Sequence, residues 1–78
     1  MEIYTIEDDK VNYNNIVMQK AREFSFENRD YIQFLNYKEK KYLIMEKISN
    51  NQCIEILDKD LKRRVVENNF KVDDGIIE

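Results

Sequence analysis

The chain opens with apolar positions in a segment rich in β-branched and aromatic residues at residues 1–6, which predicts a strand. Across residues 10–24 the apolar positions recur every three or four residues, which is the spacing of one helix face. That face consists of Tyr13, Ile16, Val17, Ala21 and Phe24. Asp8 or Asp9, just before it, can cap a helix by accepting a backbone N–H. We therefore expect a strand, a helix over residues 10–24 and a connection at residues 25–30.

Two further apolar segments flank a charged one and predict a hairpin. Residues 31–37 and 42–48 are dense in strand-forming side chains, and residues 38–41 between them are all charged. The same apolar positions also fit a single helix over residues 31–48, which no Gly or Pro interrupts. The hairpin is the favoured interpretation and the single helix is the alternative.

A second tight turn is predicted at residues 49–52, because Asn tolerates the left-handed conformation that short hairpin loops require. It leads into an alternating strand at residues 53–57. A two-residue loop would place Glu46 opposite Glu55, where like charges repel. A three-residue loop would place Lys47 opposite Glu55, where opposite charges attract, and this register is favoured.

The last predicted element is a helix over residues 61–70, with Asp58 or Asp60 as its cap. Its apolar contacts are Leu61, Val65, Val66 and Phe70. An alternative assigns residues 62–66 and 70–72 to further strands of a small barrel. The following acidic pair and glycine predict a turn before a short final segment; these residues are Asp73, Asp74 and Gly75.

The predicted order is strand, helix, three antiparallel strands, helix, within one compact domain at residues 1–78. A helix can cover one face of such a sheet. The expected fold class is therefore α+β, a small two-layer domain with an antiparallel sheet of three to four strands and two helices. A small mostly-β barrel with one helix is the alternative.

Composition argues against catalysis, because the 78 residues include no His, no Pro, no Trp, one Cys and one Gly. Imidazole bases, paired thiolate ligands and glycine-rich phosphate loops are therefore missing. The acidic pairs are best explained as caps and turns; they are Asp8 with Asp9, Asp58 with Asp60, and Asp73 with Asp74. We expect no enzyme, no catalytic residue, no metal and no cofactor. Cys53 is expected to be a small buried hydrophobe.

No stretch of the sequence is long and apolar enough to span a membrane, and the acidic start does not fit a signal peptide. The expected location is the cytoplasm, with no membrane partner. The frequent use of Ile, Lys, Asn, Tyr and Glu is typical of AT-rich genomes, such as those of some bacteria and phages.

The net charge of −3 is unevenly distributed. Residues 1–9 sum to −4, residues 10–71 to +4, and residues 72–78 to −3. Because chain ends of small domains often lie close together, the acidic ends could form one negative patch. The favoured function is therefore a non-catalytic protein-binding module, an inhibitor or adaptor of a larger intracellular machine. A phage or mobile-element antagonist of a nucleic-acid-processing defence enzyme is the most concrete version. The predicted contact residues are Glu7, Asp8, Asp9, Tyr37, Tyr42, Asp73 and Asp74.

The alternative function is a small nucleic-acid-binding regulator that uses the basic central region. Lysines and arginines can neutralise phosphates, and neighbouring tyrosines can stack on bases. The candidate cations are Lys38, Lys40, Lys41, Lys62, Arg63 and Arg64. A second alternative is a structural subunit of a homo-oligomer.

Overall fold

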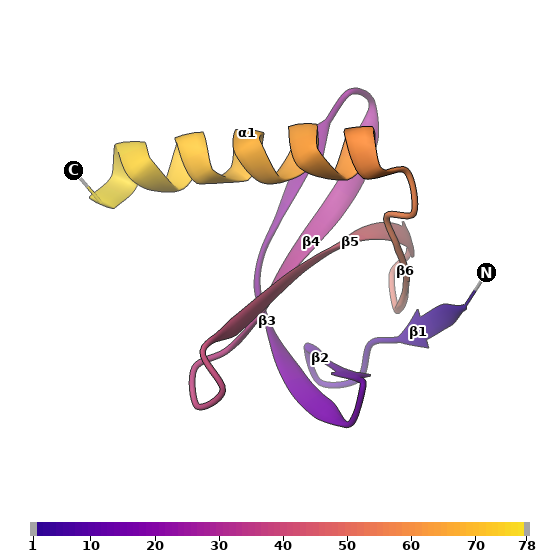
Figure 1. The fold of residues 1–78 in the computed structure, drawn as a ribbon. Coiled ribbons are helices and arrows are strands. Elements are labelled where there is room, and N and C mark those ends of the chain that lie inside the picture. Colours follow the sequence, from indigo (N-terminus) through magenta and orange to yellow (C-terminus); the bar gives the residue numbers. More distant parts are fainter. Residues whose placement is uncertain (1, 78) are drawn as a thin grey trace.

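A computed structural model describes residues 2–77 of the chain, and the side chains of residues 2–69. Six strands come first and one helix follows (Figure 1). The strands are β1 (Ile3–Thr5), β2 (Lys10–Tyr13), β3 (Ile16–Phe26), β4 (Arg29–Asn36), β5 (Lys41–Ser49) and β6 (Gln52–Glu55). The helix is α1 (Lys59–Ile77).

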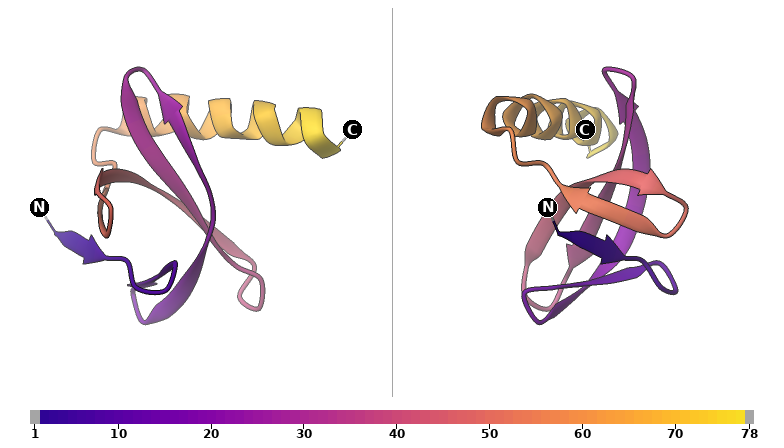
Figure 2. Two further views of the ribbon diagram at one scale, coloured as in Figure 1. Left: turned by 180° about the vertical axis from the view of Figure 1, so that it is seen from behind. Right: turned by 90° about the vertical axis from the view of Figure 1, so that its right-hand side faces the viewer.

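The six strands form one antiparallel sheet in the order β1-β6-β5-β4-β3-β2. The sheet coils until its two edge strands, β1 and β2, lie next to each other, joined at one end by the Glu7–Lys10 turn. The result is a nearly closed barrel with one helix across it, as the two views of Figure 2 show. The expected α+β fold with two helices and three to four strands is therefore wrong, and the alternative of a mostly-β barrel with one helix fits.

The helix predicted over residues 10–24 is replaced by a hairpin of β2 and β3. Asn14 and Asn15 interrupt the segment with φ angles of 51° and 66°, the left-handed pair that a two-residue hairpin turn requires. Asp8 and Asp9 likewise have φ angles of 52° and 61° and turn the chain between β1 and β2, so they do not cap a helix.

A bulge in β3 changes the face on which its side chains pack, although exposed and less exposed side chains alternate from Ile16 to Phe26. The pairing with β4 skips Ala21, since Lys20 lies opposite Phe34 and Arg22 lies opposite Gln33. A bulge of this kind re-aims the side chains that follow it. The first part of β3 therefore packs inside the barrel, and the part after Ala21 packs on the outer face beneath α1.

Two hydrophobic clusters result, one inside the barrel and one under the helix. The buried interior side chains are Val11, Met18, Ile32, Phe34, Met45 and Cys53. The buried side chains of the outer cluster are Tyr31, Ile44, Ile56 and Val65. Strand β4 contributes to both clusters, and four consecutive side chains of it are buried. This two-sided burial fixes the β4–β5 ribbon firmly in the molecule.

A polar contact joins α1 to the sheet below it. The Arg22 guanidinium donates to Gln33 Oε1 at 3.3 Å and also contacts the fully buried Asn69 of the helix. Because buried polar groups cost free energy unless they are hydrogen-bonded, this contact fixes the position of the helix over the sheet.

The predicted hairpin over residues 31–48 is confirmed, with β4 and β5 as its strands. Both predicted registers of the next hairpin are wrong. The loop does have two residues, but a bulge at Ile48 shifts the pairing, so that Glu55 lies opposite Met45 and Lys47 lies opposite Cys53. The bulge avoids the repulsion between carboxylates without creating the expected ion pair.

The C-terminal helix is confirmed, and it is longer than predicted. Asp58 Oδ1 accepts the backbone N–H of Asp60 at 2.9 Å and of Leu61 at 3.2 Å, which is the predicted cap. The alternative strands at residues 62–66 and 70–72 are wrong, because both segments are helical. The turn predicted at residues 73–75 is also wrong, since α1 continues through it to Ile77. Within the described residues, no helix is both long and apolar enough to cross a membrane.

Candidate functional site

The most exposed aromatic side chain among the described residues lies at the turn between β4 and β5. Tyr37 is 82% exposed, and Tyr42 on the other side of the turn is 44% exposed. They line an open groove of about 240 Å³ together with Leu35, Asn36, Lys40 and Lys41. We call residues 36–42 the β4–β5 tip; it is the loop at the lower left of Figure 1.

The β4–β5 tip is held in shape by one side chain. Asn36 Oδ1 accepts the backbone N–H of Glu39 at 2.8 Å, and Asn36 Nδ2 donates to the carbonyl of Val17 at 2.9 Å. The turn is therefore fastened both to itself and to β3. Lys40 completes it in a left-handed conformation, with φ at 55°. A ligand meeting the tip would find its backbone largely preorganised.

Charge at the β4–β5 tip is positive, because Lys38, Lys40 and Lys41 outnumber Glu39 and give a net charge of +2. Within residues 2–69, none of the three ammonium groups forms an ion pair with a carboxylate. Their charge is therefore available to an anionic ligand.

The other predicted basic residues occupy a different place and are largely neutralised. Arg63 pairs with Asp60 at 2.6 Å and with Glu67 at 3.8 Å. Arg64 pairs with Glu27 and with Asp60, the latter at 3.3 Å. These contacts raise the pKa of both guanidinium groups above its ordinary value, through the carboxylate hydrogen bonds. Lys62 is exposed beside them.

The helix start and the β4–β5 tip lie at opposite ends of the β4–β5 ribbon (Figure 1). Arg64 contacts Glu27 in the β3–β4 turn, where β4 begins, whereas the tip is where β4 ends. The eight residues of β4 span seven steps of ~3.3 Å, so the two places are roughly 23 Å apart. The six predicted cations therefore form two separate groups.

The acidic contact residues that the sequence predicts are also divided. Glu7, Asp8 and Asp9 lie in the β1–β2 turn. Asp9 pairs with Lys20 at 3.7 Å, and Lys20 in turn pairs with Glu23 at 2.9 Å. The side chains of residues 73 and 74, the other predicted acids, lie outside those that the structure describes. The helix that carries them ends on the other side of the molecule from β1 in Figure 1.

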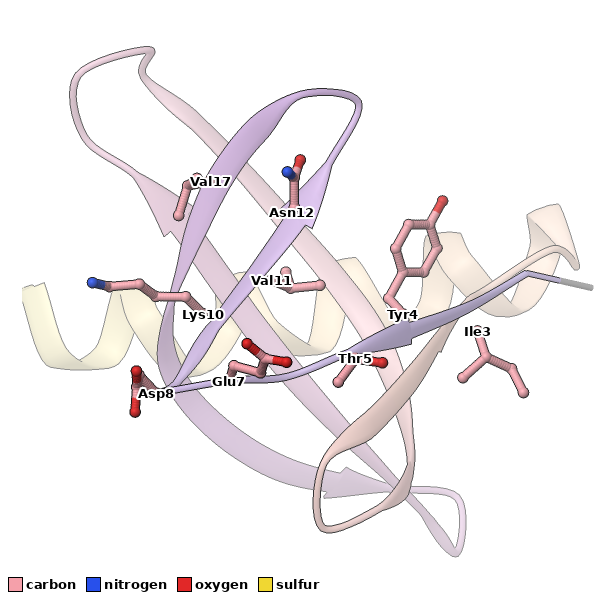
Figure 3. A pocket seen from close by; sticks show the side chains of 9 residues that line it. All are labelled: Ile3, Tyr4, Thr5, Glu7, Asp8, Lys10, Val11, Asn12 and Val17. Atoms are coloured by element: carbon pink, nitrogen blue, oxygen red, sulfur yellow. The ribbon is translucent and has the colours of Figure 1, made fainter.

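An open seam runs between the edge strands β1 and β2, and sequence reasoning missed it. Beyond the Glu7–Lys10 pair the two strands diverge, as Figure 3 shows, and leave a groove of about 460 Å³. Ile3 and Val17, both about half exposed, lie on its outer rim. We call this groove, with β1 and β2, the β1–β2 seam.

Two tyrosines and two carboxylates gather at the end of the barrel beside the seam. The rings of Tyr4 and Tyr13 are 5.5 Å apart. The Tyr4 hydroxyl lies 3.0 Å from a Glu55 carboxylate oxygen and 3.2 Å from one of Glu2, so it can donate its one hydrogen to either. Burial, followed by these carboxylates, raises the pKa of the Tyr4 phenol well above its ordinary value. Burial and Glu55 act in the same direction on the pKa of Tyr13.

The lone thiol and the carboxylates offer little reactive chemistry. Cys53 is fully buried against Met45, as predicted, and burial raises the pKa of its thiol to about 11. A thiol that stays protonated is a poor nucleophile. Among the described residues, no group of three or more acidic or cysteine side chains is arranged to hold a metal ion.

Comparison with known proteins finds no family model, no curated relative and no solved structure that matches this chain. The function is therefore argued from the geometry of the β4–β5 tip and of the β1–β2 seam.

Proposed function

We propose that this protein is a small nucleic-acid-binding regulator that holds single-stranded DNA or RNA at the β4–β5 tip. The observation that carries the proposal is one groove lined by two exposed tyrosines and by Lys40 and Lys41, which form no ion pair with a carboxylate within residues 2–69. Lysines neutralise phosphates, and tyrosine rings stack on bases of any sequence. The two arginines at the start of α1 are less suited to this role, since both already pair with carboxylates.

A single strand is the favoured form of the ligand because stacking needs bases that are not already stacked in a duplex. The β4–β5 tip is a short turn, and none of the described elements there is a helix that could enter a major groove. Exposed rings beside a basic groove are the combination that proteins use to bind unpaired strands.

The backbone at Lys40 supports a binding role. Seven described non-glycine residues have positive φ, and five of them are Asp or Asn, which tolerate this conformation. The other two are Glu27, which pairs with Arg64, and Lys40. A lysine in a left-handed turn position costs conformational energy, and such strain concentrates at functional sites.

The test is fluorescence anisotropy with labelled oligothymidylate and oligouridylate, measured across a series of salt concentrations. We expect binding at low salt that weakens as salt rises, with a slope of about −0.7 in log–log form for each phosphate neutralised. The double variant K40Q/K41Q should reduce the steepness of that slope by about 1.4 and weaken binding of both strands.

The matched control is K59Q/K62Q, which removes the same charge from two exposed lysines at the start of α1. This variant should leave binding close to that of the unaltered protein. Absence of binding to both oligonucleotides at low salt, or equal losses in the two double variants, contradicts the proposal.

A further inference from the structure

The two edge strands of the barrel carry backbone groups that face the β1–β2 seam. The Ile6 N–H bonds to the Asn51 carbonyl at 2.8 Å, so the even-numbered residues of β1 turn their amides toward β6. Backbone groups alternate along a strand, and Ile3 and Thr5 therefore direct their N–H and C=O toward the seam. An edge with this geometry can accept another strand.

Strand β2 has the same property on the opposite side of the seam. The Lys10 N–H bonds to the Glu7 carbonyl at 2.9 Å across the turn, and Tyr13 lies opposite Ile16 at the other hairpin end. Asn12, two residues after Lys10, therefore also directs its backbone groups away from β3 and into the seam. Two facing edges and a groove between them form a site for an extended chain.

The charge around the seam indicates which kind of chain can bind there. The charged side chains on and beside it are Glu2, Glu7, Asp8, Glu55 and Lys10, which sum to −3. A second copy of the chain pairing through the same edge would bring these carboxylates against their own equivalents, and like charges opposite each other are destabilising. A positively charged segment meets no such repulsion.

The rings of Tyr4 and Tyr13 give a second reason to expect that the bound segment carries a positively charged side chain. Tyr4 points into the opening between the strands in Figure 3, and its ring lies beside that of Tyr13. A Lys or Arg side chain entering there would meet aromatic faces and the carboxylates of Glu2 and Glu55 together.

We propose that the β1–β2 seam binds an extended peptide segment of another protein that carries Lys or Arg, which pairs as an added strand with the free edge of β1. Main-chain hydrogen bonds supply affinity in this mode, and alternate side chains supply specificity. The peptide's inward side chains approach Tyr4 and the carboxylates, while its outward side chains lie beside Ile3 and Val17. This site is distinct from the β4–β5 tip, although the Val17 carbonyl beside it accepts the hydrogen bond from Asn36 of the tip.

The test uses a fluorescein-labelled pentapeptide, Lys-Val-Lys-Val-Lys, with Glu-Val-Glu-Val-Glu as its charge-reversed match. In anisotropy titrations at low salt the basic peptide should bind at least about tenfold more tightly than the acidic one. The basic peptide methylated at every backbone nitrogen should lose its binding, since it cannot donate to a strand.

The matched variants are Thr5→Pro and Thr5→Val. The Thr5 N–H faces the seam and not β6, so proline removes a donor of the free edge and leaves the pairing with β6 possible. Thr5→Pro should abolish peptide binding and Thr5→Val should retain it. The melting temperature of each variant reports whether it folds.

Hydrogen exchange on the unaltered protein provides a readout that needs no variant. The Ile3 and Thr5 amides should gain protection when the basic peptide is added. Equal binding of both peptides, binding that survives N-methylation, or amides at β1 that stay unprotected would each overturn the proposal. Self-association with protection of the same amides in the absence of peptide would show that a second copy is the occupant, and would overturn it as well.

Discussion

The β4–β5 tip and the β1–β2 seam each present a pair of tyrosines, and their surroundings give the two pairs opposite chemistry. At the tip, Tyr37 is largely exposed and its charged neighbours are mainly lysines. At the seam, Tyr4 is partly buried and hydrogen-bonds two carboxylates. The net charge of −3 conceals this division. One small barrel can therefore offer an anion-binding surface and a cation-binding surface on separate parts of the sheet.

Charge reversal at the tip should produce the largest difference between ligand binding at the tip and ligand binding at the seam. K40E/K41E replaces two cations with two anions beside the proposed strand and should weaken oligonucleotide binding by about 100-fold or more at low salt. Peptide binding at the seam should change little, because neither Lys40 nor Lys41 lines the seam. Anisotropy with both probes measures the two outcomes, and a parallel loss of both would show that the surfaces are not separate.

Removal of the exposed ring comes next in size. Tyr37→Ala should weaken oligonucleotide binding by about tenfold, since base–aromatic stacking contributes about 1–3 kcal/mol per base. The slope of affinity against salt should stay the same, because no charge is lost. Tyr37→Phe retains the ring and is the control; if it binds as weakly as Tyr37→Ala, then the hydroxyl and not stacking matters.

Replacing Lys40 in the strained turn should have a moderate effect: the protein becomes more stable and binds oligonucleotides more weakly. Lys40→Gly removes the left-handed penalty, so the free energy of unfolding should rise by about 1 kcal/mol. The same substitution removes one cation and should weaken oligonucleotide binding. Urea denaturation and anisotropy measure the two quantities. A variant that is both less stable and equally active would contradict the role given to Lys40.

The smallest expected effect concerns Tyr4 at the seam, and it is a change in the stability of the protein at alkaline pH only. The pKa of Tyr4 is raised in the folded protein, so the folded state holds this proton more tightly than the unfolded state. Its contribution is complete below the ordinary tyrosine pKa of about 10 and is lost as pH rises from there toward the raised value. Stability of the unaltered protein should therefore fall more steeply above about pH 10 than that of Tyr4→Phe. Parallel urea titrations check this, and identical slopes would remove Tyr4 from the account.

The sequence predicts those parts of the fold where one local signal dominates. The charged residues between two apolar segments identified the β4–β5 hairpin, and Asp58 identified the start of α1. The β2–β3 hairpin was missed because its apolar spacing also fits a helix. The signal for it was Asn14 and Asn15, which both take the left-handed conformation. The turn predicted at residues 49–52 is present, but Asn50 and Asn51 are not in that conformation, so the reason given for this turn is wrong.

Bulges and barrel closure could not be read from the chain alone. The bulge at Ala21 moves β3 from the interior to the helix-covered face while the two-residue alternation of burial continues, so no break in the pattern marks it. The bulge at Ile48 depends on how β5 meets β6. The tyrosines and lysines of the β4–β5 tip were named as candidate contact residues from the sequence, because charged and aromatic residues next to a predicted turn can be recognised there. The seam was not, since it exists only where the two ends of the sheet meet.

The most direct test is amide shift mapping of the unaltered, isotope-labelled protein with oligothymidylate and, separately, with the basic pentapeptide. The account predicts that the oligonucleotide shifts amides at the β4–β5 tip, from Tyr37 to Lys41, and leaves Ile3 and Thr5 unchanged. The peptide should give the reverse. If both ligands shift the same amides, or if the oligonucleotide shifts only residues at the start of α1, the division into a basic tip and an acidic seam is wrong.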